Sequence, residues 1–180
     1  FDDAKKLIDQ AMAIDSTSPY VWRSLSHWEG YKGDFPASEQ SLLKAIALDS
    51  SFAWAYGQLG YLYTYQNQLE KAEKVLLKAL NMEKDDTEVL ALLGDVYYRQ
   101  NNHTEAERYY LRSLVQTTND TRFLKHKLAD IYFKTGREEK ADSLLLQVLA
   151  NGAFSALAYR SVGSIYSKNE RLEAAARHYQ

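Results

Sequence analysis

Small residues return along this sequence at a nearly constant interval of about 34 positions. One series consists of Ala4, Ser38, Ala72, Ala106, Ala141 and Ala175. Two further series keep the same phase: Ala11, Ala45, Ala79, Ser113 and Val148, and Ser26, Gly60, Gly94, Ala129 and Gly163. One globular core does not require a fixed period, whereas a stack of similar units does. The interval therefore predicts a repeat array along the whole chain.

Each period contains two amphipathic helical patterns. Over 53–66, large or small apolar residues recur at spacings of three and four, and over 69–81 a second such stripe follows. This spacing is typical of helices that bury one face. Where two helices cross closely the contact residues must be small, so Gly60 and Ala72 are expected to face each other. The chain is predicted to be all-α.

Turn residues occupy the segments between these stripes. Ser18 and Pro19 are typical of a helix N-cap followed by Pro at the first helical position. Gly33-Asp34, Asn101-Asn102 and Thr135-Gly136 mark the turns inside the units. Every interval in the first series is 34 residues except the one from Ala106 to Ala141, which is 35. The additional residue is expected in the connection at 117–122.

The pattern resembles the tetratricopeptide repeat, a helix–turn–helix unit of 34 residues. The unit 53–86 matches its signature with Tyr56, Leu59, Gly60, Tyr63, Ala72, Leu76 and Ala79, and four other units match in phase. Tyr63, Tyr97, Tyr132 and Tyr166 share one signature position, at which Glu29 is the exception. The resemblance implies a right-handed α-solenoid of antiparallel helix pairs.

The repeats divide the chain at regular intervals. We expect full repeats at 19–52, 53–86, 87–121 and 122–155, with the second helix of a truncated repeat at 1–18 and another truncated repeat at 156–180. Both ends fall within repeats, so we expect a single repeat domain that is a fragment of a longer chain. The truncated ends could then allow self-association.

Composition excludes several classes of function. The net charge of −2 provides no basic surface for nucleic acid, and no apolar run approaches the length needed to span a bilayer. The chain has no cysteine, which is compatible with both a cytosolic and an exported protein. The sequence does not fix the compartment; we favour the cytoplasm slightly over a periplasmic or other exported location.

The resemblance also implies a concave groove lined by the first helix of each pair. The groove-facing candidates are Tyr20, Arg23, His27, Tyr31, Trp54, Tyr61, Tyr65, Asp95, Tyr98, Arg99, His126, Asp130 and Lys134. Tyr and Arg are common anchors of interfaces, so a protein or peptide partner with apolar anchors is expected. The alternative for each aromatic residue is that it completes the packing between repeats.

Other motifs indicate little chemistry. His126 and Asp130 are four residues apart on one helix, but no third metal ligand is evident, and we expect neither a metal nor a cofactor. The positions of a family carboxylate clamp hold Arg23, His27, Gln58, Glu88 and Leu92. Glu88 would repel a carboxylate, which argues against binding of chaperone tails. Sequons at Asn102 and Asn119 are interpreted as turn residues.

The sequence therefore favours a non-catalytic protein–protein interaction scaffold that binds a peptide or protein segment in an aromatic groove. No catalytic residue is predicted. The alternative is a regulatory or assembly segment of a larger signalling, secretion or envelope protein, which is an analogy from the fold. Single-stranded RNA binding is a third possibility, and the balanced charge disfavours it.

Overall fold

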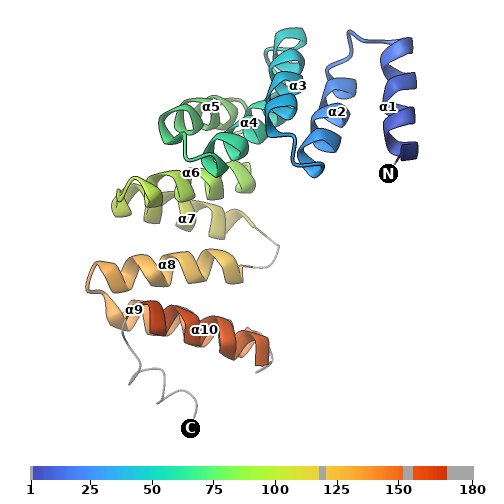
Figure 1. Ribbon diagram of the computed structural model, residues 1–180. Coiled ribbons are helices and arrows are strands. Elements are labelled where there is room, and N and C mark those ends of the chain that lie inside the picture. Colours follow the sequence, from blue (N-terminus) through green and yellow to red (C-terminus); the bar gives the residue numbers. More distant parts are fainter. Residues whose placement is uncertain (1, 118–120, 152–155, 170–180) are drawn as a thin grey trace.

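The computed structural model describes residues 2–117, 121–151 and 156–169, and within these residues all regular secondary structure is helical. The helices are α1 (Asp2–Ile14), α2 (Pro19–Tyr31), α3 (Phe35–Leu48), α4 (Ala53–Tyr65), α5 (Leu69–Met82), α6 (Thr87–Arg99), α7 (His103–Gln116), α8 (Arg122–Lys134), α9 (Glu138–Asn151) and α10 (Ala156–Lys168). They stack in chain order, with α1 and α10 at opposite ends (Figure 1). The chain is an all-α helical solenoid, as the sequence predicts.

The helix lengths explain the period. The first helices of the pairs, α2, α4, α6, α8 and α10, have 13 residues each, and the second helices α3, α5, α7 and α9 have 14. Three-residue turns join the helices of a pair, and four-residue connections at 49–52 and 83–86 lead to the next pair. The connection at 117–121 is one residue longer. The additional residue therefore lies in the predicted connection, of which 118–120 are outside the described residues.

A left-handed residue stands in the middle of each described turn within a pair. Gly33, Asn67, Asn101 and Gly136 have φ values of 79°, 59°, 60° and 73°. In each turn the next residue donates its backbone N–H to the carbonyl five positions earlier, as from Gln68 to Tyr63 at 2.8 Å. This is a helix C-terminal motif that requires positive φ, which glycine and asparagine tolerate best. Such a turn reverses the chain so that the two helices pack antiparallel.

Side-chain caps begin several helices. Asp34 accepts a hydrogen bond from the Ala37 N–H, Asp86 from Glu88 and Val89, and Asn102 from Glu105. Asn102 thus acts as a cap in its turn, in keeping with the interpretation of its sequon; Asn119 lies outside the described residues. Ser18 occupies the N-cap position before Pro19, but its side chain makes no capping bond.

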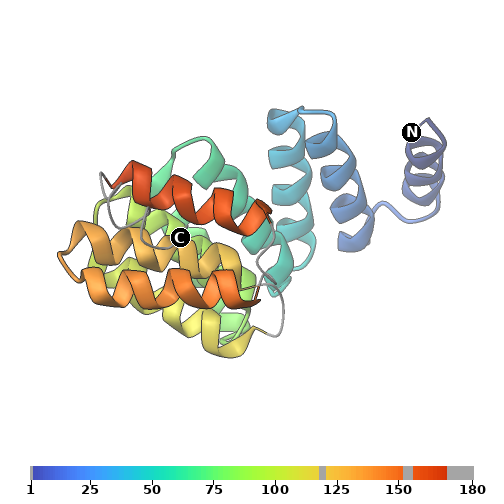
Figure 2. The same ribbon diagram turned by 90° about the horizontal axis from the view of Figure 1, so that it is seen from below.

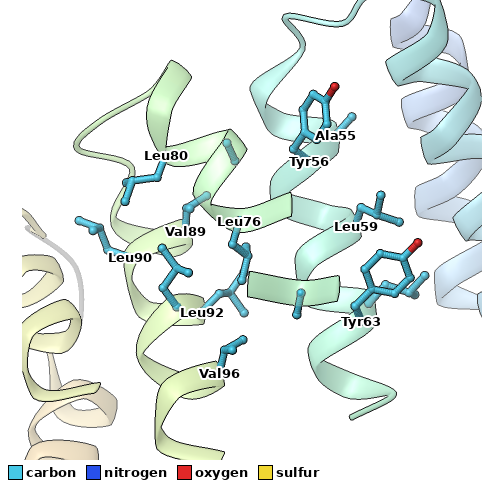
Figure 3. Packing of buried hydrophobic residues seen from close by; sticks show 14 of the residues in the cluster. Ala55, Tyr56, Leu59, Tyr63, Leu76, Leu80, Val89, Leu90, Leu92 and Val96 are labelled. Atoms are coloured by element: carbon cyan, nitrogen blue, oxygen red, sulfur yellow. The ribbon is translucent and has the colours of Figure 1, made fainter. Parts of the chain in front are cut away.

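The core is a strip between the first and second helices. Leu76 of α5 is fully buried and lies between Leu59 of α4 and Leu92 of α6 (Figure 3). A Cβ on Gly60 would overlap the Leu76 side chain, and a Cβ on Gly94 would overlap Tyr110. Gly60 was expected to face Ala72, but the residue that fills the space beside it is Leu76, one helical turn further on.

In the first full pair, serines replace glycine and alanine at the close helix crossing. The Ser38 hydroxyl donates to the Ser26 carbonyl oxygen at 2.9 Å, and both residues are buried. These two positions correspond to Gly60 and Ala72 in the next pair. A hydroxyl–carbonyl bond therefore stabilises this crossing, where the next two pairs have Gly60 and Gly94 and the fourth has Ala129.

Hydrogen bonds from tyrosines join each pair to the preceding one. Tyr63 donates to Glu39 at 2.8 Å, Tyr97 to Glu73 at 2.9 Å and Tyr166 to Asp142 at 2.7 Å, in each case from a first helix to the preceding second helix. Tyr132 faces Glu107 in the same arrangement, and burial and that carboxylate raise the pKa of its phenol. Burial and the neighbouring carboxylate raise the pKa of Tyr63 to about 12, so its phenol stays a donor. We call these four pairs, Tyr132–Glu107 included, the tyrosine–carboxylate ladder.

The first junction carries a different pair. Glu29 stands where the other units have tyrosine, and Lys5 of α1 stands where they have a carboxylate. Burial raises the pKa of the Glu29 carboxyl, while a hydrogen bond from Ser41 at 2.6 Å and the charge of Lys5 act in the opposite direction. The carboxylate thus lies on the first helix here and not on the second, an exchange relative to the ladder, and Lys5 itself forms an ion pair with Asp9 of α1.

The array twists along its length. In both ribbon views the axes of α2 and α3 run at a steep angle to those of α8 and α9 (Figure 2). Successive pairs therefore present their exposed faces in different directions.

Candidate binding site

The predicted groove residues separate into two groups on the structure. Those of α2 and α4 surround an open aromatic pocket, whereas those of α6 and α8 mostly form hydrogen bonds within the protein. The difference lies in what occupies the wide junctions between first helices. Helices α4 and α6 pack against each other, but α2 and α4, and likewise α6 and α8, are not closely packed. The first of these wide junctions is open, and the second is filled by polar side chains.

The pocket lies between α2, α3 and α4 and has a volume of about 460 Å³. Its walls are Ser26, His27, Gly30, Tyr31, Phe35, Ser38, Leu42, Trp54, Gln58, Tyr61, Leu62 and Tyr65. Five predicted site residues are among them: His27, Tyr31, Trp54, Tyr61 and Tyr65. Except for the His27 imidazole, no wall residue has an ionisable group other than a tyrosine phenol. The pocket is therefore an apolar and aromatic cavity.

Its aromatic rim remains accessible to a ligand. Tyr31, Tyr61 and Tyr65 are 70%, 50% and 61% exposed, although an aromatic ring ordinarily buries much of its area in a folded protein. Tyr65 is held by Phe35, with ring centroids 5.1 Å apart. The rim is thus partly ordered by contacts between aromatic rings before any ligand is present.

A second hollow of about 640 Å³ adjoins the pocket on the side of α1. The two share His27, Tyr31 and Trp54 as walls, so they form two lobes of one depression. Arg23 lines the second lobe, and its guanidinium lies 5.5 Å from the Trp54 ring and 5.6 Å from the Tyr20 ring. Tyr20 is 60% exposed and packs on Phe52 beside the depression, but it lines neither lobe.

Small residues explain why the pocket exists. A Cβ added to Gly30 would lie 3.6 Å from the Ser38 hydroxyl oxygen. Ser26 belongs to the same wall of the pocket. Larger side chains at these positions would fill the space between α2 and α3. The aromatic residues of the pocket were among the predicted groove residues, but Ser26, Gly30 and Ser38 were not. A small residue in a helix is as typical of close helix packing as of a cavity.

A buried polar cluster fills the second wide junction. Tyr98 of α6 donates its hydroxyl hydrogen to Asp130 of α8, and Lys134 donates to the Tyr98 oxygen at 2.6 Å. From the end of the described chain, Lys168 and Asn169 donate to Asp130 at 2.9 and 3.1 Å. Asp130 is only 2% exposed. Burial raises the pKa of its carboxyl, but the bonds from Tyr98, Lys168 and Asn169 outweigh burial and hold it below its usual range.

The other predicted residues also have partners within the protein. Asp95 accepts hydrogen bonds from Tyr110 at 2.6 Å and from Lys127 at 2.7 Å. Arg99 donates to the Thr64 carbonyl at 2.8 Å and so satisfies the end of α4. His126 is half-buried on α8. These residues tie neighbouring repeats together, which is the packing alternative that the sequence left open.

The carboxylates of the tyrosine–carboxylate ladder were not singled out from the sequence. Glu39, Glu73, Glu107 and Asp142 recur with the repeat period, each 24 or 25 residues before its tyrosine. That regularity is visible in the sequence, but acidic residues are common on exposed helix faces. Only the structure shows that each one meets a buried or half-buried phenol.

Neither a metal centre nor a membrane span is evident in the part of the chain that the structure describes. No group of three or more His, Asp and Glu side chains is placed to hold a metal ion in 2–117, 121–151 and 156–169. Among the same residues, no helix combines the length and the apolar character needed to cross a bilayer.

Comparison with known proteins identifies the repeat. Three family models described as tetratricopeptide repeat match residues 41–74, 58–121 and 124–150. No curated protein sequence matches the chain.

Several solved structures share its fold at low sequence identity. The crystal structure of MamA superposes with a TM-score of 0.75 at 18% identity, covering 92% of this chain and 90% of that one. YrrB, described as a TPR protein with an unusual peptide-binding site, gives 0.74 at 21% identity, covering 93% and 86%. PilF of Pseudomonas aeruginosa gives 0.79 at 19% identity, covering 98% and 82%. At these identities the likeness concerns the fold alone.

Proposed function

Because the chain belongs to the tetratricopeptide-repeat family, whose arrays are interaction scaffolds, we propose that it binds a peptide segment of a partner protein in the depression between α2 and α4. The observation that carries this proposal is the cluster of exposed aromatic residues, Tyr31, Tyr61 and Tyr65, around a 460 Å³ cavity. A large exposed aromatic surface beside a cavity is typical of a binding site. The peptide-binding site for which YrrB is described provides a precedent within the same fold.

The shape and chemistry of the depression define the ligand. An apolar or aromatic side chain of the peptide enters the lobe between α2, α3 and α4, where no carboxylate or ammonium group lines the wall. The peptide backbone then lies over the rim, where tyrosine hydroxyls and Gln58 can donate and accept hydrogen bonds. Such a site selects an anchor residue and its immediate neighbours. The scaffold itself carries out no chemistry.

Selection from a displayed library of random peptides tests the proposal directly, because the enriched peptides themselves reveal which anchor residue the depression selects. These peptides are then titrated against the protein while the fluorescence of Trp54 is followed in a Trp22→Phe/Trp28→Phe background. Trp54 is a wall of both lobes, so an anchor that enters either lobe changes its emission.

Replacing two rim residues, in the variant Tyr61→Ala/Tyr65→Ala, is expected to weaken binding of these peptides at least about tenfold, because central aromatic anchors commonly contribute about 2 kcal/mol or more. The matched control is Phe123→Ala, which removes another half-exposed aromatic ring, on α8 and outside the pocket. This control should bind normally. Equal affinity of the wild-type protein and the rim variant for every enriched peptide would place the site elsewhere.

A further inference from the structure

A second periodic feature lies on the second helices of the pairs, at positions that do not line the pocket. Leu43, Leu77, Leu111 and Leu146 recur with the repeat period on the second helices, and each is 39–46% exposed. Each directly follows a core residue that is at most 2% exposed: Leu42, Leu76, Tyr110 and Leu145. We call these four exposed leucines the outer ridge. The core does not require leucine here, and helix propensity would be served as well by Ala, Gln or Glu.

Basic residues flank the outer ridge on three helices. On α5, Lys74 and Lys78 stand one turn apart around Leu77, and on α7, Arg108 and Arg112 stand around Leu111 in the same way. Lys44 follows Leu43 on α3. The stretches from the first of these basic residues to the C-terminal end of each helix, 44–48, 74–82 and 108–116, contain no Asp or Glu. The chain as a whole has a net charge of −2. The C-terminal parts of α3, α5 and α7 therefore carry exposed leucine and basic residues, whereas Glu70 and Glu105 lie in the first turns of α5 and α7.

Part of this charge is left without an acidic partner. Within the described residues, neither Lys74 nor Lys78 has a carboxylate at ion-pair distance, and Lys78 lies instead 4.4 Å from the Tyr56 ring. Arg108 pairs with Glu105 in the first turn of its own helix, and Arg112 pairs with Asp85 at 3.7 Å. Beyond Arg112, Val115 is 82% exposed one turn further along α7. Helices α5 and α7 thus expose three apolar side chains, Leu77, Leu111 and Val115. The ammonium groups of Lys74 and Lys78 add positive charge that no carboxylate of the described residues balances at ion-pair distance.

From this combination we infer that the outer face of α5 and α7 binds an acidic amphipathic helix of a partner protein. An amphipathic helix presents apolar residues at spacings of three and four, which match a narrow apolar strip, and acidic residues beside them would pair with Lys74 and Lys78. The inference is independent of the pocket, since no residue of the outer ridge between α5 and α9 lines either lobe.

The twist of the array favours a helix over a lipid surface. Helix α3 runs at a steep angle to α8 and α9 in both views (Figures 1 and 2), so the exposed faces of successive repeats do not share one plane. A flat membrane would reach only part of the outer ridge. A helix about 10–12 Å across needs only a narrow strip of one or two second helices.

The test is a selection of helical peptides from a displayed amphipathic library, with the pocket variant Tyr61→Ala/Tyr65→Ala as the target so that the outer face is examined separately. The expected peptides carry Asp or Glu beside apolar residues at helical spacing. Their dissociation constants should rise at least about tenfold for Leu77→Ser/Leu111→Ser and for Lys74→Glu/Lys78→Glu. A peptide with its acidic residues changed to lysine should regain affinity for the second variant. Circular dichroism shows whether each variant retains its helical fold.

The matched control introduces the same two glutamates at the corresponding positions two repeats further on, Ser143→Glu/Gln147→Glu on α9. This control should change the dissociation constants less than about twofold. The inference is overturned if no acidic helix is enriched, or if enriched helices bind all variants equally. It is also overturned if vesicles of phosphatidylserine and phosphatidylcholine bind the protein through Leu77 and Lys78 while no helix does. Failure of this selection leaves the pocket proposal untouched, because the two surfaces are tested with separate variants.

Discussion

At the scale of single residues, the tyrosine–carboxylate ladder shows how one position can fix the contact between repeats. Each phenol crosses from a first helix to the second helix before it, so one side chain both packs in the core and bonds to the neighbouring unit. A buried phenol without an acceptor would be costly. The periodic carboxylates therefore have a structural reason, which the tyrosine series alone did not reveal.

The variant Tyr97→Phe tests the contribution of one ladder bond. It removes the hydroxyl that donates to Glu73 at 2.9 Å and keeps the ring, so we expect a loss of about 1 kcal/mol in the free energy of unfolding. Urea denaturation measures this change. Tyr20→Phe is the control, because Tyr20 is 60% exposed and lies outside the ladder. An equal loss of unfolding free energy in Tyr20→Phe would contradict the prediction, because it would show that removing any tyrosine hydroxyl has this effect, whether or not it belongs to the ladder.

At the scale of helices and turns, the left-handed residue in each turn determines how sharply a pair closes. Gly136 has a φ of 73°, and nothing lies within 4 Å of the position that a Cβ would occupy. Replacement by alanine therefore introduces backbone strain without a steric clash.

We expect Gly136→Ala to lower the free energy of unfolding by about 1 kcal/mol, since a left-handed conformation costs an L-residue roughly 1–2 kcal/mol. The reverse change at an equivalent turn, Asn101→Gly, should leave stability unchanged or raise it slightly. Thermal denaturation of both variants distinguishes a conformational cost from a lost contact. Unchanged stability of Gly136→Ala would mean that the turn adapts to negative φ.

The polar cluster around Asp130 connects three first helices, α6, α8 and α10, and its stability depends on pH. Because the pKa of Asp130 is lower in the folded protein than in the unfolded chain, the ionised carboxylate stabilises the fold at neutral pH. This contribution is complete above the unfolded pKa, near about 4, and is lost as the pH falls through the folded value.

We therefore expect Asp130→Asn to cost about 2 kcal/mol at pH 7, in line with hydrogen bonds to a charged group, and the difference from wild type to shrink below about pH 4. Urea titrations at a series of pH values measure both effects. Asp3→Asn, a change at an exposed carboxylate, should have an effect under about 0.5 kcal/mol. A difference that does not vary with pH would assign the loss to packing.

At the scale of the whole molecule, the sequence predicted the repeat, its helix pairs and the connection with the additional residue, because each depends on spacing along the chain. It also singled out Tyr31, Trp54, Tyr61 and Tyr65, which line one pocket in the structure, while their role in binding stays a prediction. It could not separate these residues from Tyr98 and Asp130, which occupy similar positions on later first helices. The separation depends on long-range contacts such as the bond from Lys168 to Asp130, and a local pattern does not contain them.

The exchanged pair at the first junction has a consequence for repeat shuffling. If α2 followed α3 directly, Glu29 would meet Glu39, and two carboxylates would repel each other in a half-buried site. If α4 followed α1, the Tyr63 hydroxyl would meet the ammonium group of Lys5. An ammonium group cannot accept the hydrogen bond that this phenol donates. Duplication, deletion or recombination among the later repeats conserves a compatible junction, whereas rearrangement at the first does not. The four later junctions can thus vary in evolution or in protein engineering, while α1 and α2 must be inherited together.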